Sequence, residues 1–149
     1  MGSRAGQTGM ALTEVLVALL VFSLGVLGAA LLQLNALKYS DSAMRSSQVS
    51  FLAHDLLERI RANPDSHYAL SSLGQAPAFG NLDSPRDQDL FDFARQLRRM
   101  AGEDVQASVA VTGAQVTVTV EWNDARAGQQ AGEKQLLTVS SLIAGRDMP

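Results

Sequence analysis

The sequence contains no cysteine, and this absence excludes a disulfide framework, a thiolate zinc site, a cysteine nucleophile and a lipidated cysteine. Aromatic residues make up only 5% of the chain, and charged residues 18%, below the roughly 25% usual for soluble domains. The 12 basic and 15 acidic residues give a net charge of -3, whereas nucleic-acid-binding domains usually carry a clustered basic surplus. The 149 residues correspond to one domain.

The deficit of charge is concentrated in one segment, because residues 15–37 contain no charged side chain. As a helix this segment would be about 35 Å long, enough to cross a hydrocarbon core of roughly 30 Å. A buried helix of a soluble protein would need a core on all sides, and a cleaved secretory signal has a shorter apolar run of about 7–15 residues. The sequence therefore predicts a retained membrane helix. Arg4 before it and Lys38 and Arg45 after it do not fix its orientation by charge.

A single acidic residue, Glu14, lies at the N-terminal edge of the apolar segment. A carboxylate at membrane depth costs about 2.5–3.5 kcal/mol on insertion scales, which makes such a residue a functional candidate. Alternatively, Glu14 lies at the membrane interface or complements the helix dipole in the first turn. The residue by itself leaves both interpretations open.

The residues around Glu14 extend the pattern, since Gly9-Met10-Ala11-Leu12-Thr13-Glu14 leads directly into the apolar run. This segment resembles the N-terminal motif of type IV pilins, in which a short polar leader ends in glycine and glutamate is the fifth mature residue. The similarity continues to Pro64, and the ending LERIRANP resembles minor pilins of the PilV type. The resemblance implies cleavage after Gly9, N-methylation of Met10, and pairing of the Glu14 charge during assembly.

The resemblance also implies a function and a location. Minor pilins take part in the initiation or tip complex of a type IV pilus and support twitching motility and adhesion. The expected partners are other minor pilins, the major pilin, a tip adhesin, the prepilin peptidase and the inner membrane. The chain would cross that membrane once, with its N-terminus in the cytoplasm and its head in the periplasm, before it enters the pilus. The alternatives are a type II secretion pseudopilin and a bitopic membrane protein with a ligand-binding periplasmic domain.

The helical pattern continues beyond the apolar segment but becomes amphipathic. One apolar stripe recurs at helical spacing, and two further residues are expected to widen it: Val49, Leu52, Leu56 and Ile60, with Phe51 and Leu57. Asp41/Arg45 and Asp55/Arg59 are spaced for ion pairs along one helix. Asn63-Pro64 should end the helix, because the residue before proline is driven out of the α region.

The remaining sequence predicts a loop at 64–86, a helix at 87–101 and three strands. Ser84-Pro85 is typical of a helix start and Gly102 of a helix end, and the expected buried stripe is Leu90, Phe93 or Ala94, Leu97 and Met100. Alternating apolar residues predict strands at 105–111, 116–122 and 135–143, with a hairpin turn at Gly113 and a polar loop at 123–132. Such a meander is stable only if the helices cover its apolar face.

The predicted fold class is therefore α+β, of the type IV pilin-like kind. A long N-terminal helix, transmembrane in its first half and amphipathic in its second, packs on a small antiparallel sheet with one extra helix. The predicted organisation is a leader at 1–9, a transmembrane or filament-core helix at 10–37, and a periplasmic head at 38–149 that includes the C-terminal half of the long helix.

The sequence provides little for catalysis. The two histidines, His54 and His67, are too few and too scattered for a metal site, and the acidic residues from Asp83 to Asp92 lack the glycine of a calcium loop. There is no phosphate-binding loop and no nucleophile elbow. We therefore expect a non-enzyme without catalytic residues, cofactor or metal. The aromatic residues Tyr39, Tyr68 and Trp122 are expected in the core or at an interface.

Overall fold

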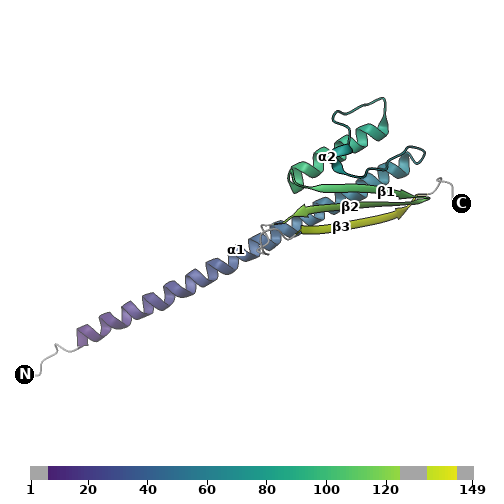
Figure 1. Ribbon diagram of the computed structural model, residues 1–149. Helices are drawn as coiled ribbons and strands as arrows, with labels where there is room; N and C mark the ends of the chain where they lie inside the picture. Colours follow the sequence, from purple (N-terminus) through teal and green to yellow (C-terminus); the bar gives the residue numbers. More distant parts are fainter. Residues whose placement is uncertain (1–6, 125–133, 144–149) are drawn as a thin grey trace, which may run out of the picture.

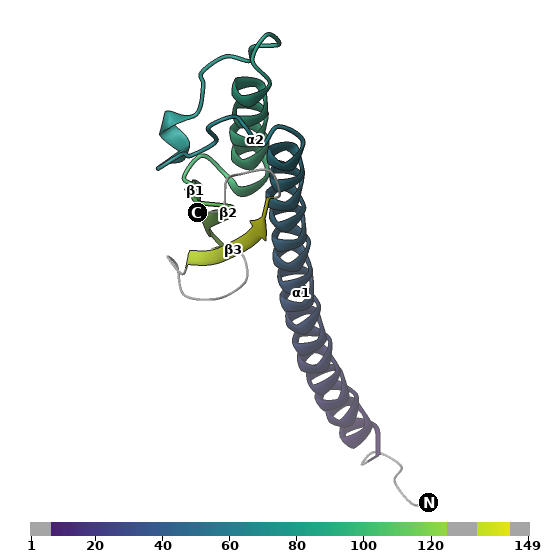
Figure 2. The same ribbon diagram turned by 90° about the vertical axis from the view of Figure 1, so that its right-hand side faces the viewer.

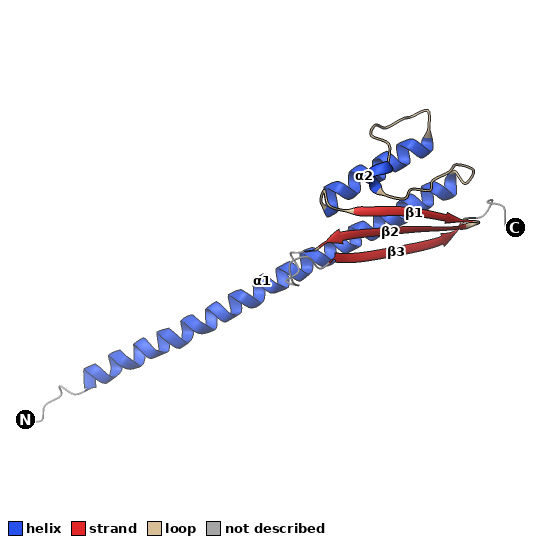
Figure 3. Cartoon of the chain, viewed as in Figure 1, coloured by secondary structure: helices blue, strands red, loops and turns tan. Residues whose placement is uncertain are grey.

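The computed structural model describes residues 7–124 and 134–143, with side chains from Leu12 onward. Its elements are α1 (Gln7–Ala62), the short 3₁₀ helix η1 (Leu73–Gln75), α2 (Pro85–Ala101), β1 (Gln106–Thr112), β2 (Gln115–Asn123) and β3 (Lys134–Leu142). Figures 1 and 3 show α1 projecting far beyond a head in which α2 and the three strands gather along its C-terminal part. The predicted α+β class is confirmed, with one long helix, one further helix and an antiparallel sheet.

Helix α1 has 56 residues and a length of about 84 Å. It begins at Gln7, so the backbone is helical on both sides of the predicted cleavage position at Gly9. The helix ends at Ala62 as predicted from Asn63-Pro64, and the backbone N–H of Asn63 donates to the carbonyl oxygen of Arg59 at 3.1 Å. One continuous element thus connects the N-terminal motif to the head.

The buried face of α1 agrees with the predicted stripe except at one position. Val49, Leu52, Leu56, Leu57 and Ile60 are buried, as is Ala53. Phe51, expected to widen the stripe, is 72% exposed, so that prediction is wrong. Each residue turns the helix by about 100°, which places Phe51 almost opposite the centre of the buried stripe.

The three strands form an antiparallel meander in the order β1-β2-β3. Thr112 pairs with Gln115 across a two-residue turn, and Gly113 has a φ of 57°, a left-handed value that favours glycine. The predicted hairpin is confirmed. Alternate residues of β2 are buried: Val116, Val118, Val120 and Trp122. Of the loop predicted at 123–132, residues 125–132 lie outside the described residues.

The two helices provide the expected cover for the sheet. Helix α1 lies against β2 and β3, and α2 packs beside α1 (Figure 2). Helix α2 begins after Ser84 and ends before Gly102, as predicted, and buries Leu90, Phe93, Ala94 and Leu97. Met100 was expected in that stripe but remains 37% exposed, because Ala101 lies closer to its centre and is buried instead.

We expect Leu56→Ala to lower the free energy of unfolding of the head by about 2–5 kcal/mol, because Leu56 is 1% exposed and its truncation leaves a cavity. The full chain in detergent micelles provides the assay. Trp122 is the sole tryptophan and is buried in the head, so its fluorescence reports unfolding.

Phe51→Ala is the matched control on the exposed side of α1, where substitutions usually change stability by within about 0.5 kcal/mol. Equal unfolding midpoints for the two variants would contradict the assigned core face.

Candidate functional site

The first half of α1 is not covered by the described part of the head. Every residue from 12 to 41 is exposed, including more than a dozen leucine, valine and phenylalanine side chains. By length and composition this helix can cross a membrane, and none of its most apolar stretch is buried by the head. An exposed apolar helix of this length requires a lipid or protein environment.

The small and polar residues within this apolar surface are compatible with such an environment. Ser23 donates its hydroxyl hydrogen to the carbonyl oxygen of Leu19 at 2.6 Å, so it is satisfied within the helix. A Cβ added at Gly25 or Gly28 would meet no atom within 4 Å. The packing of the described chain therefore does not require glycine there, whereas small residues are common where membrane helices approach closely.

The structure places Gly9, Met10 and Glu14 on the first turns of the same helix. Met10 and Glu14 are four residues apart, so they share a face about one turn apart. Glu14 is exposed, and within the described residues its side chain forms no ion pair. The next charged residue along α1 is Lys38, 24 positions away. A cation for Glu14 must therefore come from the chain's own N-terminal region or from another molecule.

No family model, curated protein or solved structure matches this chain.

The head begins to contact α1 at Ser42, the first half-buried residue of the helix, a few residues after the predicted boundary at 37/38. Ser42 donates its hydroxyl hydrogen to a carboxylate oxygen of Asp124, which is buried at the end of β2. This contact joins residues 82 positions apart and fixes the near end of the sheet to the helix. Within the described residues, the other carboxylate oxygen of Asp124 and the indole nitrogen of Trp122 have no hydrogen-bond partner.

A polar cluster fixes the far end of the head to α1. Arg59 forms ion pairs with Asp55 at 2.8 Å and with Asp89 of α2 at 3.0 Å. The Tyr68 hydroxyl donates to the second oxygen of Asp89 at 2.8 Å and accepts a hydrogen bond from the Asn63 amide at 3.2 Å. Hydrogen bonds to Asp89 and then Asp55 raise the pKa of Arg59. The cluster thus connects α1, the following loop and α2.

The Asp55/Arg59 pair was predicted from sequence and is confirmed, as is Asp41/Arg45 at 3.7 Å. The contributions of Asp89 and Tyr68 were not predicted, because residues 30 and 21 positions apart carry no local pattern that marks their contact. Tyr68 and Trp122 are buried, as expected for core aromatics, whereas Tyr39 is exposed on α1.

The two histidines do not approach a common site. The His54 ring nitrogen Nδ1 lies 2.8 Å from the carbonyl oxygen of Ser50 within α1, whereas His67 belongs to the loop before Tyr68. The described residues contain no group of three or more histidine, aspartate and glutamate side chains placed to hold a metal ion.

Burial, and then the hydrogen bond to Asp89, raise the pKa of Tyr68 from 10.0 to about 12. The folded head therefore favours the protonated phenol. Because the folded pKa exceeds the unfolded one, this stabilisation is complete below pH 10 and is lost as pH rises through about 12.

We expect the unfolding midpoint of the head to fall between pH 10 and about 12, and Tyr68→Phe to flatten that fall. The measurement is denaturant unfolding of the full chain in micelles across this pH window, followed by Trp122 fluorescence. Tyr39→Phe is the control, since Tyr39 is exposed. An equal fall in all three proteins would contradict the role of Tyr68.

Proposed function

We propose that the chain is a minor pilin of the PilV type, synthesised as a membrane-anchored precursor and incorporated into the initiation or tip complex of a type IV pilus. One observation carries the proposal. A single continuous helix bears Gly9, Met10 and Glu14 at its start, an exposed apolar stretch next, and an amphipathic half beneath an α+β head. The role is structural rather than enzymatic.

The exposed half of α1 suits both a membrane and a filament. Lipid surrounds this half in the membrane, with the head on the periplasmic side and the N-terminus in the cytoplasm. Because lipid tails and the helices of other subunits are similarly apolar, transfer into a filament exchanges one apolar environment for another, and close packing favours association. The head is joined to α1 by its core and by polar contacts that include those of Ser42 and Arg59, so it moves with the helix.

The test has two readouts in the native cell. Intact mass spectrometry of the membrane-extracted protein should find a chain that starts at N-methyl-Met10. Deletion of the gene should abolish surface pili and twitching while leaving exoprotein secretion unchanged. A protein that retains residues 1–9 would contradict the processing assignment, and lost secretion with normal twitching would instead identify a type II secretion pseudopilin.

A further inference from the structure

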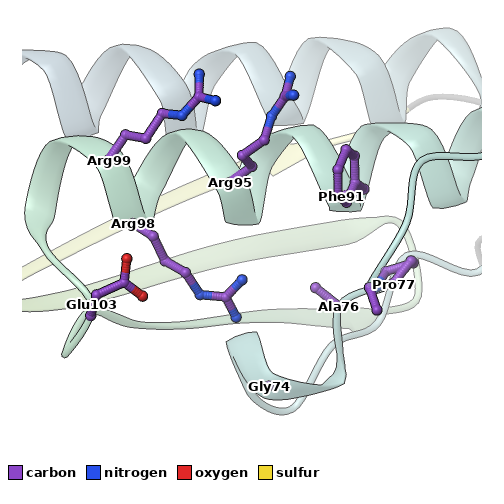
Figure 4. Close-up of a pocket in the computed structure, with 9 residues that line it drawn as sticks. Gly74, Ala76, Pro77, Phe91, Arg95, Arg98, Arg99 and Glu103 are labelled. Atoms are coloured by element: carbon purple, nitrogen blue, oxygen red, sulfur yellow. The ribbon is translucent and has the colours of Figure 1, made fainter.

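A cavity of about 480 Å³ lies in the head, between the C-terminal part of α2 and the loop that contains η1 (Figure 4). Three arginines of α2 line it together with Phe91, Glu103 and the loop residues: Arg95, Arg98 and Arg99, and Gly74, Ala76, Pro77 and Ala78. Its volume lies within the roughly 300–1,000 Å³ typical of ligand pockets. The cavity is remote from the N-terminal motif, and neither the processing nor the membrane anchoring of the chain uses it.

Two of the three arginines of this cavity differ from the other arginines in the described residues. Five of the seven arginines in the described residues form an ion pair with a carboxylate: Arg45, Arg59, Arg61, Arg86 and Arg95. The two without a carboxylate are Arg98 and Arg99, and both line this cavity. Arg98 donates one hydrogen bond to the carbonyl oxygen of Leu73 at 3.3 Å, and Arg99 makes no hydrogen bond within the described residues.

The surroundings hold two of these cations, Arg95 and Arg98, in place. Leu70 exchanges two backbone hydrogen bonds with Val109 of β1, at 2.8 and 2.9 Å, which fixes the start of the loop. The Arg98 bond then ties the loop to α2. Arg95, paired with Asp92 at 3.0 Å, lies 5.2 Å from the centre of the Phe91 ring. The cavity therefore has an anchored loop wall and two arginines with fixed contacts, whereas Arg99 is exposed.

The charge of the side chains that line the cavity is opposite in sign to the net charge of the chain. Three arginines and one acidic residue, Glu103, line the cavity, whereas the whole chain has a net charge of -3. Arg95 repels Arg98 and Arg99 at spacings of three and four residues along α2. The helix dipole favours cations in the last turn but does not require them to share a cavity with Phe91 and Pro77. An anionic ligand would relieve this repulsion.

We infer that the cavity binds a carboxylate-bearing peptide segment of another protein. Arg98 and Arg99 have donors free for two acidic side chains, because a guanidinium pairs with carboxylate in a two-pronged geometry. Phe91, Ala76 and Pro77 provide an apolar wall for a neighbouring side chain of the same peptide. A bare inorganic anion would leave that wall unfilled, and Glu103 disfavours highly charged ligands. The inference does not depend on the proposed function, since the cavity lies wholly in the head.

The experiment uses the full chain in detergent micelles and a random 12-residue peptide library displayed on phage. Peptides enriched on the wild-type protein should carry paired aspartate or glutamate residues, and one such peptide is then synthesised for titration. Arg98→Gln/Arg99→Gln should weaken its binding about tenfold or more, because the neutral side chains lose the charged hydrogen bonds to the acidic residues of the peptide. Replacing the acidic residues of the peptide by glutamine should have the same effect.

Arg61→Gln is the matched control, since it removes one positive charge from the head outside the cavity. It should bind the peptide within about twofold of wild type, because the lost charge lies outside the cavity and is screened by salt. Trp122 fluorescence confirms that each variant is folded. The proposal is overturned if enriched peptides show no acidic preference, if they bind the double variant as tightly as wild type, or if inorganic phosphate binds this site while no acidic peptide does.

Discussion

Gly9→Val is expected to leave the protein as full-length precursor in the membrane. Helix α1 runs through Gly9 and Met10 without a break, so the bond proposed to be cut lies within a helical segment of the chain. A peptidase that must expose and fit this bond gains from glycine, which has no side chain and is the weakest helix former apart from proline. Valine adds a branched side chain next to the cut. Intact mass spectrometry of the membrane fraction distinguishes the precursor from a chain starting at Met10.

Gly25→Val is the matched control, because it makes the same substitution in the same helix. A Cβ at position 25 meets no atom within 4 Å, so the fold accommodates it. We expect this variant to be trimmed as completely as wild type. Normal trimming of Gly9→Val would show that the cleavage position is assigned incorrectly, whereas failure of both variants would point to a general defect in membrane insertion.

The sequence predicted most of the fold because local patterns determine it. The apolar run, the Asn63-Pro64 stop, the Ser84-Pro85 start and the glycine turn at 113 each act on their immediate neighbours. The alternation in β2 was equally clear, since every second residue from Val116 to Trp122 faces the helix. The start of α1 at Gln7 was not predicted, because residues 7–11 carry no capping signal and no periodicity of their own.

The two wrong burial predictions concern helix residues, whose exposure depends on the direction in which each side chain projects from the helix axis. Phe51 and Met100 are large and apolar, and both lie next to buried positions in the sequence. The core is filled instead by Ala53 and Ala101, which lie nearer the centre of each buried face. Hydrophobicity alone favours the larger residue, whereas helical geometry decides which residue faces inward.

The polar features of the head could not be predicted, because their members are distant in sequence. Asp89 reaches Arg59 and Tyr68 only after α2 packs against α1. Arg98 and Arg99 form part of a cavity only after the η1 loop folds back beside α2. From sequence alone, these arginines were indistinguishable from an ordinary basic helix end. The N-terminal motif is different, since Gly9, Met10 and Glu14 are contiguous and their spacing is visible in the sequence.

Glu14→Ala is expected to abolish most incorporation into sheared pili while leaving cleavage, membrane anchoring and the head unchanged. Within a filament the Glu14 carboxylate would lie among apolar helices, where an unpaired charge is strongly disfavoured. Under the proposed function, cleavage after Gly9 would create an amine at Met10, one turn away from Glu14 along α1, and a neighbouring subunit would offer the same group. The ion pair would mainly set the register of the subunit and its entry into the filament, since a buried ion pair adds little net stability. Quantitative immunoblotting of sheared pili against the membrane fraction measures the loss.

Two further variants separate charge from shape. Glu14→Gln keeps the size of the side chain but removes the charge, so it should fail as Glu14→Ala does if the amine requires an anion. Glu58→Ala removes an exposed carboxylate paired with Arg61 near the end of α1, and its incorporation should remain close to wild type. All three proteins should show the same Trp122 fluorescence, and each should have the mass calculated for its own sequence starting at Met10, because the substitutions leave the head and the residues around Gly9 unaltered. Wild-type recovery of Glu14→Ala in pili would identify Glu14 as an interfacial residue with no part in charge pairing, whereas normal recovery of Glu14→Gln alone would show that a neutral hydrogen-bonding side chain suffices at this position.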